Sequence, residues 1–381
     1  MVNSSANQEA FDELKAYGEK FGHLLQGLKQ QDGLLEEQYS ERELVFEKDK
    51  LKLYRYVANE SKNDNSENNT NETSENKSTV KTPVLIVYAL VNRPSILDLQ
   101  QGHSAIEQML ESGLDVYLID WGYPDESDKH LDLNYYINEQ IDACVDLVCS
   151  KESALQGKPV KQVSVMGVCQ GGVLGLCYSS LHPQRVKNIV TLVTPIDFHT
   201  KEDTLSNLVR YIDIDLMVKT MGNIPGDMLS NTFLSLRPYY LQLKKYLNLV
   251  DATDQLDEKS KERIANFILM ERWIFDSPDQ AGVAFGEFVR GCYQQNQLIK
   301  NTLKVGGCPI DLTNLDIPVL NIYANKDHLV PPASSKALEK LIPKHQYQAM
   351  PVKGGHIGIF VSPKSVQTIF PAIADWLRKH S

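Results

Sequence analysis

The sequence predicts an α/β fold with a doubly wound, mostly parallel sheet and an inserted, mainly helical cap. Short apolar strand patterns alternate with helical patterns up to residue 198, which is typical of helices that cover both faces of a sheet. The alternation stops at 199–304, where the chain turns helical and aromatic, and strand patterns return near Ile317. We therefore expect a first core part at 1–198, a cap or lid at 199–304 and a second core part at 305–381.

The N-terminal region before the sheet contains three different patterns. Residues 7–30 place apolar side chains at helical spacing, and we expect this amphipathic helix to pack on the core. Residues 43–57 alternate as two short strands around a charged turn. Residues 59–78 consist almost entirely of Asn, Ser, Glu, Lys, Thr and Asp, which predicts a disordered loop inserted within the core.

The core elements follow from apolar runs and helical spacing. Before the cap, the predicted strands are 83–88, 115–119, 162–166 and 188–193, and the predicted helices are 101–112, 133–148 and 173–181. After the cap, strands are expected at 317–323 and 346–351.

Composition excludes several classes of protein. The 381 residues are 42% hydrophobic and 23% charged, as in ordinary globular proteins. A net charge of -10 argues against nucleic acid as a partner, because phosphate binding needs a basic stripe. No apolar run reaches the length of a transmembrane helix, and the first 28 residues do not resemble a secretory signal. We expect a cytoplasmic protein whose cysteines stay reduced.

The most informative stretch is Gly167-Val168-Cys169-Gln170-Gly171-Gly172, which follows a strand pattern and precedes a helical one. A nucleophile elbow has this strand, tight turn and helix, and the small residues at 167 and 171 relieve crowding around its strained backbone. The alternative is a buried structural cysteine beside a glycine turn.

An acid and a histidine follow Cys169 in the order that an α/β hydrolase requires. Asp327 comes after the strand at 317–323, and His356 lies on a glycine loop after the strand at 346–351. His356 would activate the thiol and Asp327 would orient His356. By analogy with α/β hydrolases, the oxyanion hole would use the backbone N–H groups of Gln170 and Val91.

Other polar residues near these motifs have structural interpretations. We expect His328 to cap its loop, His199 to act as a hinge hydrogen-bonder and Asp120 to fix the loop after its strand. Cys177 is expected in the core. The remaining cysteines at 144, 149, 292 and 308 are also predicted to be structural, because they lack metal-binding spacing.

The cysteine box at 167–172 and several motifs around it resemble those of the polyhydroxyalkanoate synthases, and most closely those of the catalytic subunit of the class III, two-subunit type. The cysteine box Gly-x-Cys-x-Gly-Gly of that family is matched at 167–172. Further matches are Tyr88-Ala89-Leu90-Val91-Asn92-Arg93-Pro94, Ile119-Asp120-Trp121-Gly122, Thr194-Pro195-Ile196-Asp197-Phe198, Asp327-His328-Leu329-Val330-Pro331 and Gly354-Gly355-His356. Together they span roughly residues 80 to 381. Short class IV synthases share these features, so the boundary between the two classes stays open.

The resemblance implies an acyltransferase that polymerises (R)-3-hydroxyacyl-CoA, in particular 3-hydroxybutyryl-CoA, through an acyl-cysteine on Cys169. Coenzyme A would be a leaving group, and no other cofactor or metal is implied. Asp327 or His356 could also activate the 3-hydroxyl of a second unit. The implied partners are a second synthase subunit and the surface of a polyester granule, and a homo-oligomer is compatible with the sequence.

Two other functions fit part of the pattern. A cysteine-dependent hydrolase of the dienelactone hydrolase or thioesterase type would use the same nucleophile and release an acid to water, but dienelactone hydrolases lack so large an aromatic cap. A noncatalytic granule-coating protein would not need the ordered Cys169, Asp327 and His356. Measuring CoA release together with high-mass polyester separates all three functions.

Deletion of residues 59–78 with a short Gly/Ser bridge should leave activity and thermal stability nearly unchanged. The segment has too few apolar side chains to offset the entropy lost on ordering it. Polymerisation rate and melting temperature of the deletion variant test this expectation, and a large loss of either would show that the segment docks on the folded protein.

Overall fold

The computed structural model describes residues 12, 15–16, 19–28, 39–57, 83–251 and 257–380, except the side chains of Tyr240 and Gln242. The predicted disordered loop at 59–78 lies outside these residues, as does part of the predicted N-terminal helix.

An eight-stranded sheet forms the centre of the described chain, with the order β1-β2-β4-β3-β5-β6-β9-β10. Its strands are β1 (Arg42–Lys48), β2 (Leu51–Tyr56), β3 (Pro83–Val87), β4 (Asp115–Asp120), β5 (Val163–Val168), β6 (Val186–Leu192), β9 (Val319–Ala324) and β10 (Tyr347–Val352). From β4 to β10 every neighbouring pair is parallel, whereas β1 and β2 add an antiparallel edge. The predicted doubly wound sheet is confirmed, and the carboxyl ends of its parallel strands share one edge.

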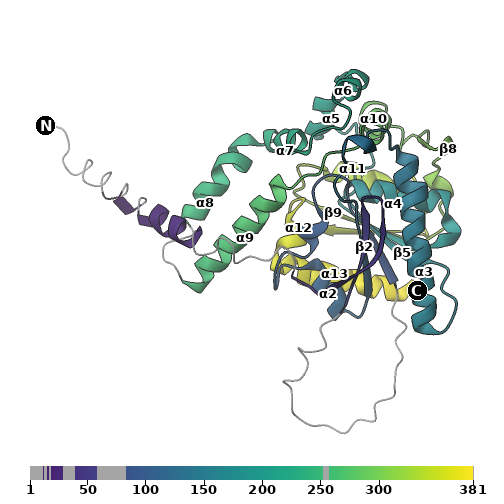
Figure 1. The fold of residues 1–381 in the computed structure, drawn as a ribbon, viewed down its shortest axis with the longest axis horizontal. Coiled ribbons are helices and arrows are strands. Elements are labelled where there is room, and N and C mark those ends of the chain that lie inside the picture. The colour runs from purple at the N-terminus through teal and green to yellow at the C-terminus, as the bar shows by residue number, and fades with distance from the viewer. Residues whose placement is uncertain are drawn as a thin grey trace, which may run out of the picture.

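Helices cover both faces of this sheet (Figure 1). The core helices are α2 (Ala105–Glu111), α3 (Asp142–Gln156), α4 (Gln170–Leu181), α11 (Pro332–Lys336), α12 (Gly358–Val361) and α13 (Pro363–Lys379), with a π-helical segment η4 (Tyr135–Ile141) before α3. Short 3-10 turns η2 (Pro94–Leu97), η3 (Glu126–Asp128), η5 (Pro183–Arg185), η8 (Leu312–Asn314) and η9 (Ala337–Lys340) connect them. Residues of α3 and α4 share one hydrophobic cluster, and residues of α2 and α13 share the other.

The two clusters lie on opposite faces of the sheet because successive strand side chains point in opposite directions. In β4, Tyr117 and Ile119 belong to the cluster with α3 and α4, whereas Val116 and Leu118 belong to the cluster with α2 and α13. All four are at most 1% exposed, as expected for a central strand buried on both faces.

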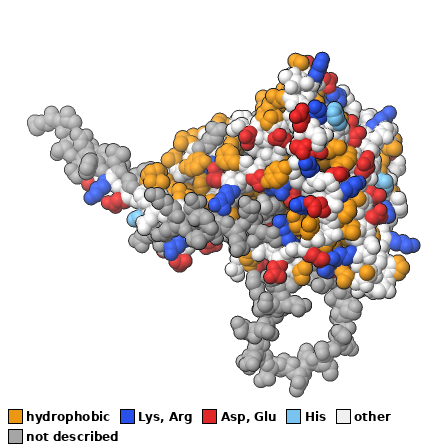
Figure 2. Space-filling model, viewed as in Figure 1, with side chains coloured by type: hydrophobic (Ala, Val, Ile, Leu, Met, Phe, Trp, Pro, Cys, Tyr) orange, Lys and Arg blue, Asp and Glu red, His pale blue; other side chains and the backbone are white. Residues whose placement is uncertain are grey.

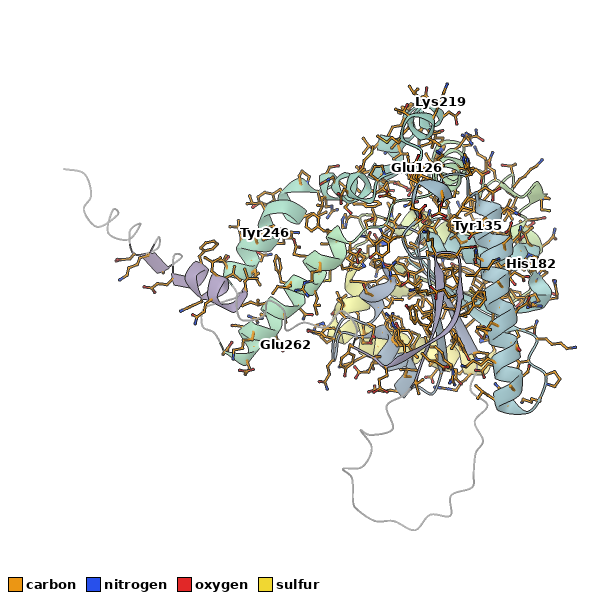
Figure 3. All side chains as sticks on the ribbon, viewed as in Figure 1. Glu126, Tyr135, His182, Lys219, Tyr246 and Glu262 are labelled. Carbon is orange, nitrogen blue, oxygen red and sulfur yellow. The ribbon has the colours of Figure 1, made fainter. Side chains whose placement is uncertain are left out.

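Residues between β6 and the hairpin of β7 (Lys304–Val305) and β8 (Cys308–Pro309) are mainly helical where described. They form α5 (Thr204–Val209), α6 (Ile214–Met221), α7 (Gly226–Ser235), η6 (Tyr239–Lys244), α8 (Lys245–Asp251), α9 (Glu258–Phe275), α10 (Gly282–Phe288) and η7 (Val289–Gln294). The helices α8 and α9 form an arm that extends from the body of the molecule (Figure 1). Figure 3 places Tyr246 and Glu262 on this arm, away from the sheet.

The N-terminal helical segment packs on this arm, so the prediction that it packs on the core is wrong. Leu24 is 5% exposed in a separate small cluster with Leu249 and Ile264 of the arm. Phe21, which has the same helical spacing, is 49% exposed. Figure 2 shows hydrophobic side chains along the surface of the arm, where Tyr246 and Leu247 of α8 are exposed. The amphipathic pattern predicted a buried face but did not identify the surface that covers it.

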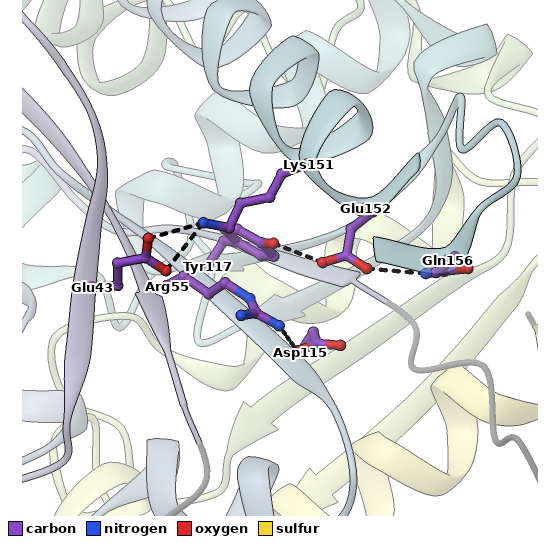
Figure 4. Close-up of polar contacts among 7 residues, drawn as sticks. All are labelled: Glu43, Arg55, Asp115, Tyr117, Lys151, Glu152 and Gln156. Atoms are coloured by element: carbon purple, nitrogen blue, oxygen red, sulfur yellow. Dashed lines mark hydrogen bonds and ion pairs between the residues drawn. The ribbon is translucent and has the colours of Figure 1, made fainter. Parts of the chain in front are cut away.

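Polar contacts at the antiparallel edge join β4 to α3, β2 to β4, and α3 to β1 (Figure 4). The Tyr117 hydroxyl donates to Glu152 at 2.7 Å, and Arg55 donates to Asp115 at 2.8 Å. Lys151 of α3 pairs with Glu43 of β1. The bonds to Glu152 and Asp115 compensate for the burial of these two carboxylates, whereas the Lys151–Glu43 pair is exposed.

No helix in the described part of the chain is both long enough and apolar enough to cross a membrane.

Candidate active site

Cys169 occupies the turn between β5 and α4 in a strained backbone conformation. Its φ is 52° and its ψ is -122°, a region that residues other than glycine rarely adopt. Such a conformation costs on the order of 1–3 kcal/mol and persists only where neighbouring contacts hold it. Here the Cys169 N–H donates to the Leu192 carbonyl at 2.9 Å, and the Cys169 carbonyl accepts from the Gly172 N–H at 3.0 Å. The predicted nucleophile elbow is therefore present.

The glycines at 167 and 171 are required by close backbone approaches, as the sequence predicted. A Cβ at Gly167 would lie 2.3 Å from the Cα of Gly172, and a Cβ at Gly171 would lie 2.2 Å from the Val87 carbonyl oxygen. No side chain could be added at either position without moving the backbone. The elbow consequently packs directly against itself and against the end of β3.

His356 and Asp327 lie together beside the elbow, at the carboxyl ends of the neighbouring strands β10 and β9. The His356 Nδ1 and the Asp327 Oδ2 are 2.7 Å apart, and both side chains are buried. The other carboxylate oxygen, Oδ1, accepts from the N–H groups of Leu329 and Val330 at 2.9 and 2.8 Å. These bonds fix the Asp327 carboxylate so that Oδ2 faces the imidazole.

The side chain of Cys169 also acts electrostatically on the imidazole of His356. Burial alone would lower the pKa of His356, but the charges of Asp327 and Cys169 and the hydrogen bond to Asp327 raise it from 6.5 to about 10. Because Nδ1 is engaged with Asp327, the other ring nitrogen, Nε2, is the one available to the sulfur. The three predicted residues thus form one connected chain of polar groups, in which Cys169 is partly exposed.

Two tyrosines to which the sequence reasoning gave no site role interact electrostatically with Cys169. Burial, and then the negative charge of Cys169, raises the pKa of Tyr88. Burial, followed by the charges of Asp203 and Cys169, raises the pKa of Tyr293. Both hydroxyls therefore remain neutral at physiological pH. Tyr88 opens one of the family motifs but was given no role, and nothing in the sequence distinguished Tyr293 from the chain's other aromatic residues.

The predicted oxyanion-hole residues lie on two adjacent segments. Gln170 is the first residue of α4, so its N–H is at a helix N-terminus. Val91 is on the loop after β3, and this loop touches the elbow because the Leu90 N–H donates to the Gln170 side-chain oxygen Oε1 at 3.0 Å. The sequence reasoning used only the backbone of Gln170 and missed this side-chain contact.

The structural interpretations of the neighbouring polar residues have different outcomes. Asp120 fixes its loop as predicted, since it accepts from Arg93 and from the Gly122 N–H. His199 is a hydrogen-bonder as predicted, with Nε2 at 3.0 Å from the Tyr293 carbonyl oxygen. The loop-capping role predicted for His328 is performed by Asp327, which binds the two following N–H groups.

Among the other cysteines, the residues at 144, 149, 177 and 292 are buried. Cys308 was expected to be structural but is exposed on the hairpin β7–β8. In the described residues, no group of three or more His, Cys, Asp or Glu side chains is arranged to hold a metal ion.

The raised pKa of His356 gives a testable pH dependence. The ring should stay protonated through neutral pH and titrate near pH 10, and Asp327→Asn should lower this pKa because it removes the charge that favours the imidazolium. Since the folded-state pKa is raised, the stabilisation is complete below about pH 6.5 and is lost as the pH rises to about 10.

NMR titration of ¹³C-labelled histidine rings, with the signal assigned through His356→Gln, measures this pKa. Urea unfolding across the same pH range should show a smaller alkaline loss of stability in Asp327→Asn than in the unchanged chain. Identical His356 titration curves with and without the Asp327 carboxylate would contradict the electrostatic account.

Comparison with known proteins agrees with the fold and the resemblance. A family model described as the alpha/beta hydrolase fold matches residues 82–363. The poly(3-hydroxyalkanoate) polymerase subunit PhaC of Thiocystis violacea is 47% identical over 369 residues, covering 97% of this chain and 96% of that protein. The subunit of the same name from Allochromatium vinosum is 44% identical over 367 residues, covering 96% of each chain.

Among solved structures, a monoacylglycerol lipase of Paleococcus ferrophilus superposes with a TM-score of 0.50 at 18% identity, covering 79% of this chain and 97% of the lipase. This likeness shows the fold alone. The extent and identity of the sequence matches establish the family: the chain belongs to the poly(3-hydroxyalkanoate) polymerases, enzymes built on the α/β-hydrolase fold.

Proposed function

We propose that the chain polymerises (R)-3-hydroxyacyl-CoA, with 3-hydroxybutyryl-CoA as the expected substrate, through a covalent acyl-cysteine at Cys169. The observation that carries this proposal is the connected chain from Asp327 through His356 to a cysteine on a strained elbow. The family gives the class of product, and this geometry supports the roles of the three residues.

In the first half-reaction, the Cys169 sulfur attacks the thioester carbonyl and forms a tetrahedral intermediate. The N–H groups of Gln170 and Val91 would stabilise its oxyanion. The intermediate collapses as the bond to the CoA sulfur breaks, and CoA leaves with the proton that His356 took from the thiol. One thioester replaces another, so the acyl group stays activated for transfer. CoA leaves as a product, and the reaction needs no additional cofactor.

In the second half-reaction, the 3-hydroxyl of another hydroxyacyl unit attacks the acyl-cysteine. His356 takes the hydroxyl proton, a new ester bond forms, and the sulfur of Cys169 departs. We assign the proton transfer to His356 because its ring interacts electrostatically with Cys169, whereas the Asp327 oxygens are engaged with the ring and the loop N–H groups. Asp327 holds the ring in orientation and stabilises the imidazolium.

Residues 199–304 would act as a lid that protects the acyl-cysteine from water. Support comes from α9, whose residues Leu269, Met270, Trp273 and Ile274 pack in the same hydrophobic cluster as Cys169. Excluding water favours transfer to a hydroxyl group over hydrolysis, and the lid must open for substrate to enter and polyester to leave.

Cys169→Ala should abolish polymerisation while preserving the fold, because the elbow accommodates a small side chain but no acyl group can be carried. Cys169→Ser should retain little activity, since a serine hydroxyl is far from ionised at neutral pH. CoA release and high-mass polyester from 3-hydroxybutyryl-CoA measure both effects, and circular dichroism checks the fold. Polymer formation by Cys169→Ala at a comparable rate would rule out covalent catalysis through this residue.

We further propose that the chain works with a second synthase subunit at the surface of a cytoplasmic polyester granule, with homo-oligomers also compatible. The relatives named above are themselves described as polymerase subunits. A partner that binds the open lid better than the closed lid would raise the active fraction tenfold for each 1.4 kcal/mol or so of preference.

The isolated chain should therefore show a kinetic lag and low turnover, and a co-expressed second subunit should shorten the lag and raise turnover without supplying catalytic residues. The test compares CoA release by the purified chain with and without that subunit. Full, lag-free activity of the chain alone would contradict the two-subunit proposal.

A further inference from the structure

The loop after β3 and the elbow are in direct backbone contact. Gly171 lies so close to β3 that an added Cβ would be 2.2 Å from the Val87 carbonyl oxygen and 2.6 Å from the Tyr88 carbonyl oxygen. On the other side, the Trp121 indole donates to the Tyr88 carbonyl at 2.9 Å. The end of β3 is therefore held between α4 and the loop after β4.

Leu90, two residues after Tyr88 along this loop, is held by the side chain of Gln170 in the elbow. The Leu90 N–H donates to Gln170 Oε1 at 3.0 Å, and both residues are 8% exposed. Leaving this buried N–H group without an acceptor would destabilise the folded protein by roughly 1–3 kcal/mol. The bond therefore strongly favours one position of the loop. Val91 directly follows Leu90, so its N–H group is placed by the same contact.

The far end of the loop is held by the cap helix α9. The Asn92 side-chain amide lies 3.4 Å from the carbonyl oxygens of Trp273 and Ile274, and the Trp273 indole donates to the Arg93 carbonyl at 2.7 Å. Asn92 has a φ of 58°, so the chain turns sharply immediately after Val91. Val91 thus lies between one residue tied to the elbow and two residues tied to the cap.

We propose that Gln170 is a positioning residue for the oxyanion hole. Its backbone N–H would be one of the two oxyanion donors, and its side-chain oxygen holds the loop that presents the other, at Val91. The inference rests on the proposed acyl-cysteine chemistry. This role requires a hydrogen-bond acceptor in the side chain at position 170, so a residue without one could not fulfil it.

Two reactions of the same sulfur distinguish this role from a general effect on the site. Acyl transfer from a CoA thioester develops negative charge on the carbonyl oxygen and needs the oxyanion hole. Alkylation by iodoacetamide needs the reactive sulfur but forms no oxyanion. A change that only misplaces the Val91 loop should therefore slow acylation and spare alkylation.

The experiment uses the full chain with Gln170→Met, which keeps the backbone N–H and the length of the side chain but removes the acceptor. The matched control is Gln280→Met, because Gln280 is also a buried glutamine (3% exposed) but its side-chain amide has no recorded hydrogen-bond partner within the described structure. Single-turnover CoA release with limiting 3-hydroxybutyryl-CoA measures acylation. Mass spectrometry of the Cys169 peptide measures both the acyl adduct and the rate of alkylation at several pH values.

Gln170→Met should lower the acylation rate about 10- to 100-fold, as expected for an oxyanion donor displaced by roughly 1 Å, without a comparable rise in the substrate concentration needed for half saturation. Its alkylation rate and pH profile should stay within about twofold of the unchanged chain, as should all rates of Gln280→Met. Circular dichroism checks that the variant is folded, because the cysteine of an unfolded chain would also react with iodoacetamide. Should the methionine variant prove unstable, Gln170→Leu also lacks the acceptor and serves in its place.

Unchanged acylation in Gln170→Met would overturn the positioning role, and so would an equal loss of acylation and alkylation. Failure of the unchanged chain to form an acyl adduct at Cys169 would instead remove the proposed function on which the inference rests. The two failures are therefore distinguishable in one set of measurements.

Discussion

The strained backbone at the carboxyl edge of the sheet is the constraint on which the site depends. Cys169, which directly follows β5, has a φ of 52°. Val193, which directly follows β6, has a φ of 46°, although a positive φ is strongly unfavourable for a β-branched residue. The Cys169 N–H donates to the Leu192 carbonyl, and the Val193 N–H donates to the Ile322 carbonyl of β9 at 2.8 Å. These bonds continue the parallel ladder past the strand ends, so the loop carrying Asp327 is held beside the elbow.

The cap is fastened to the same edge through the loops that border the site. Trp273 and Asp276, at the end of α9, bond to the Arg93 carbonyl and to the Tyr123 hydroxyl. Nearer the start of α9, the side-chain nitrogen Nδ2 of Asn266 lies 3.0 Å from Nε2 of His103. A movement of α9 would therefore disturb the loop after β3, which includes the predicted oxyanion donor at Val91. If α9 moves as the proposed lid requires, these contacts would couple substrate access to the geometry of the site.

The sequence predicted the sheet, the elbow and the order of Cys169, Asp327 and His356, because each depends on local signals. Apolar strand runs, glycines at close approaches and loop positions after strands can all be recognised along the chain. The contacts of Gln170 with Leu90 and of Asn92 with α9 join residues 80 or more positions apart, and no local pattern specifies them. For the same reason, the amphipathic N-terminal helix was predicted but its packing on the arm was not.

The stability of the closed cap follows from the strength of its contacts at this edge. The bonds made by Asn92, Trp273, Asp276 and Asn266 with their partners are each worth about 0.5–1.5 kcal/mol, or a few kcal/mol together. In the proposed lid mechanism, a difference of about 3 kcal/mol would keep the open form to about 1% of the molecules, because each 1.4 kcal/mol or so changes the ratio tenfold. The closed cap would then protect an acyl-cysteine from water, yet a partner with only modest preference for the open form could redistribute the two states. In that mechanism, the same few hydrogen bonds that hold the loop around Val91 would also set how readily the site admits substrate.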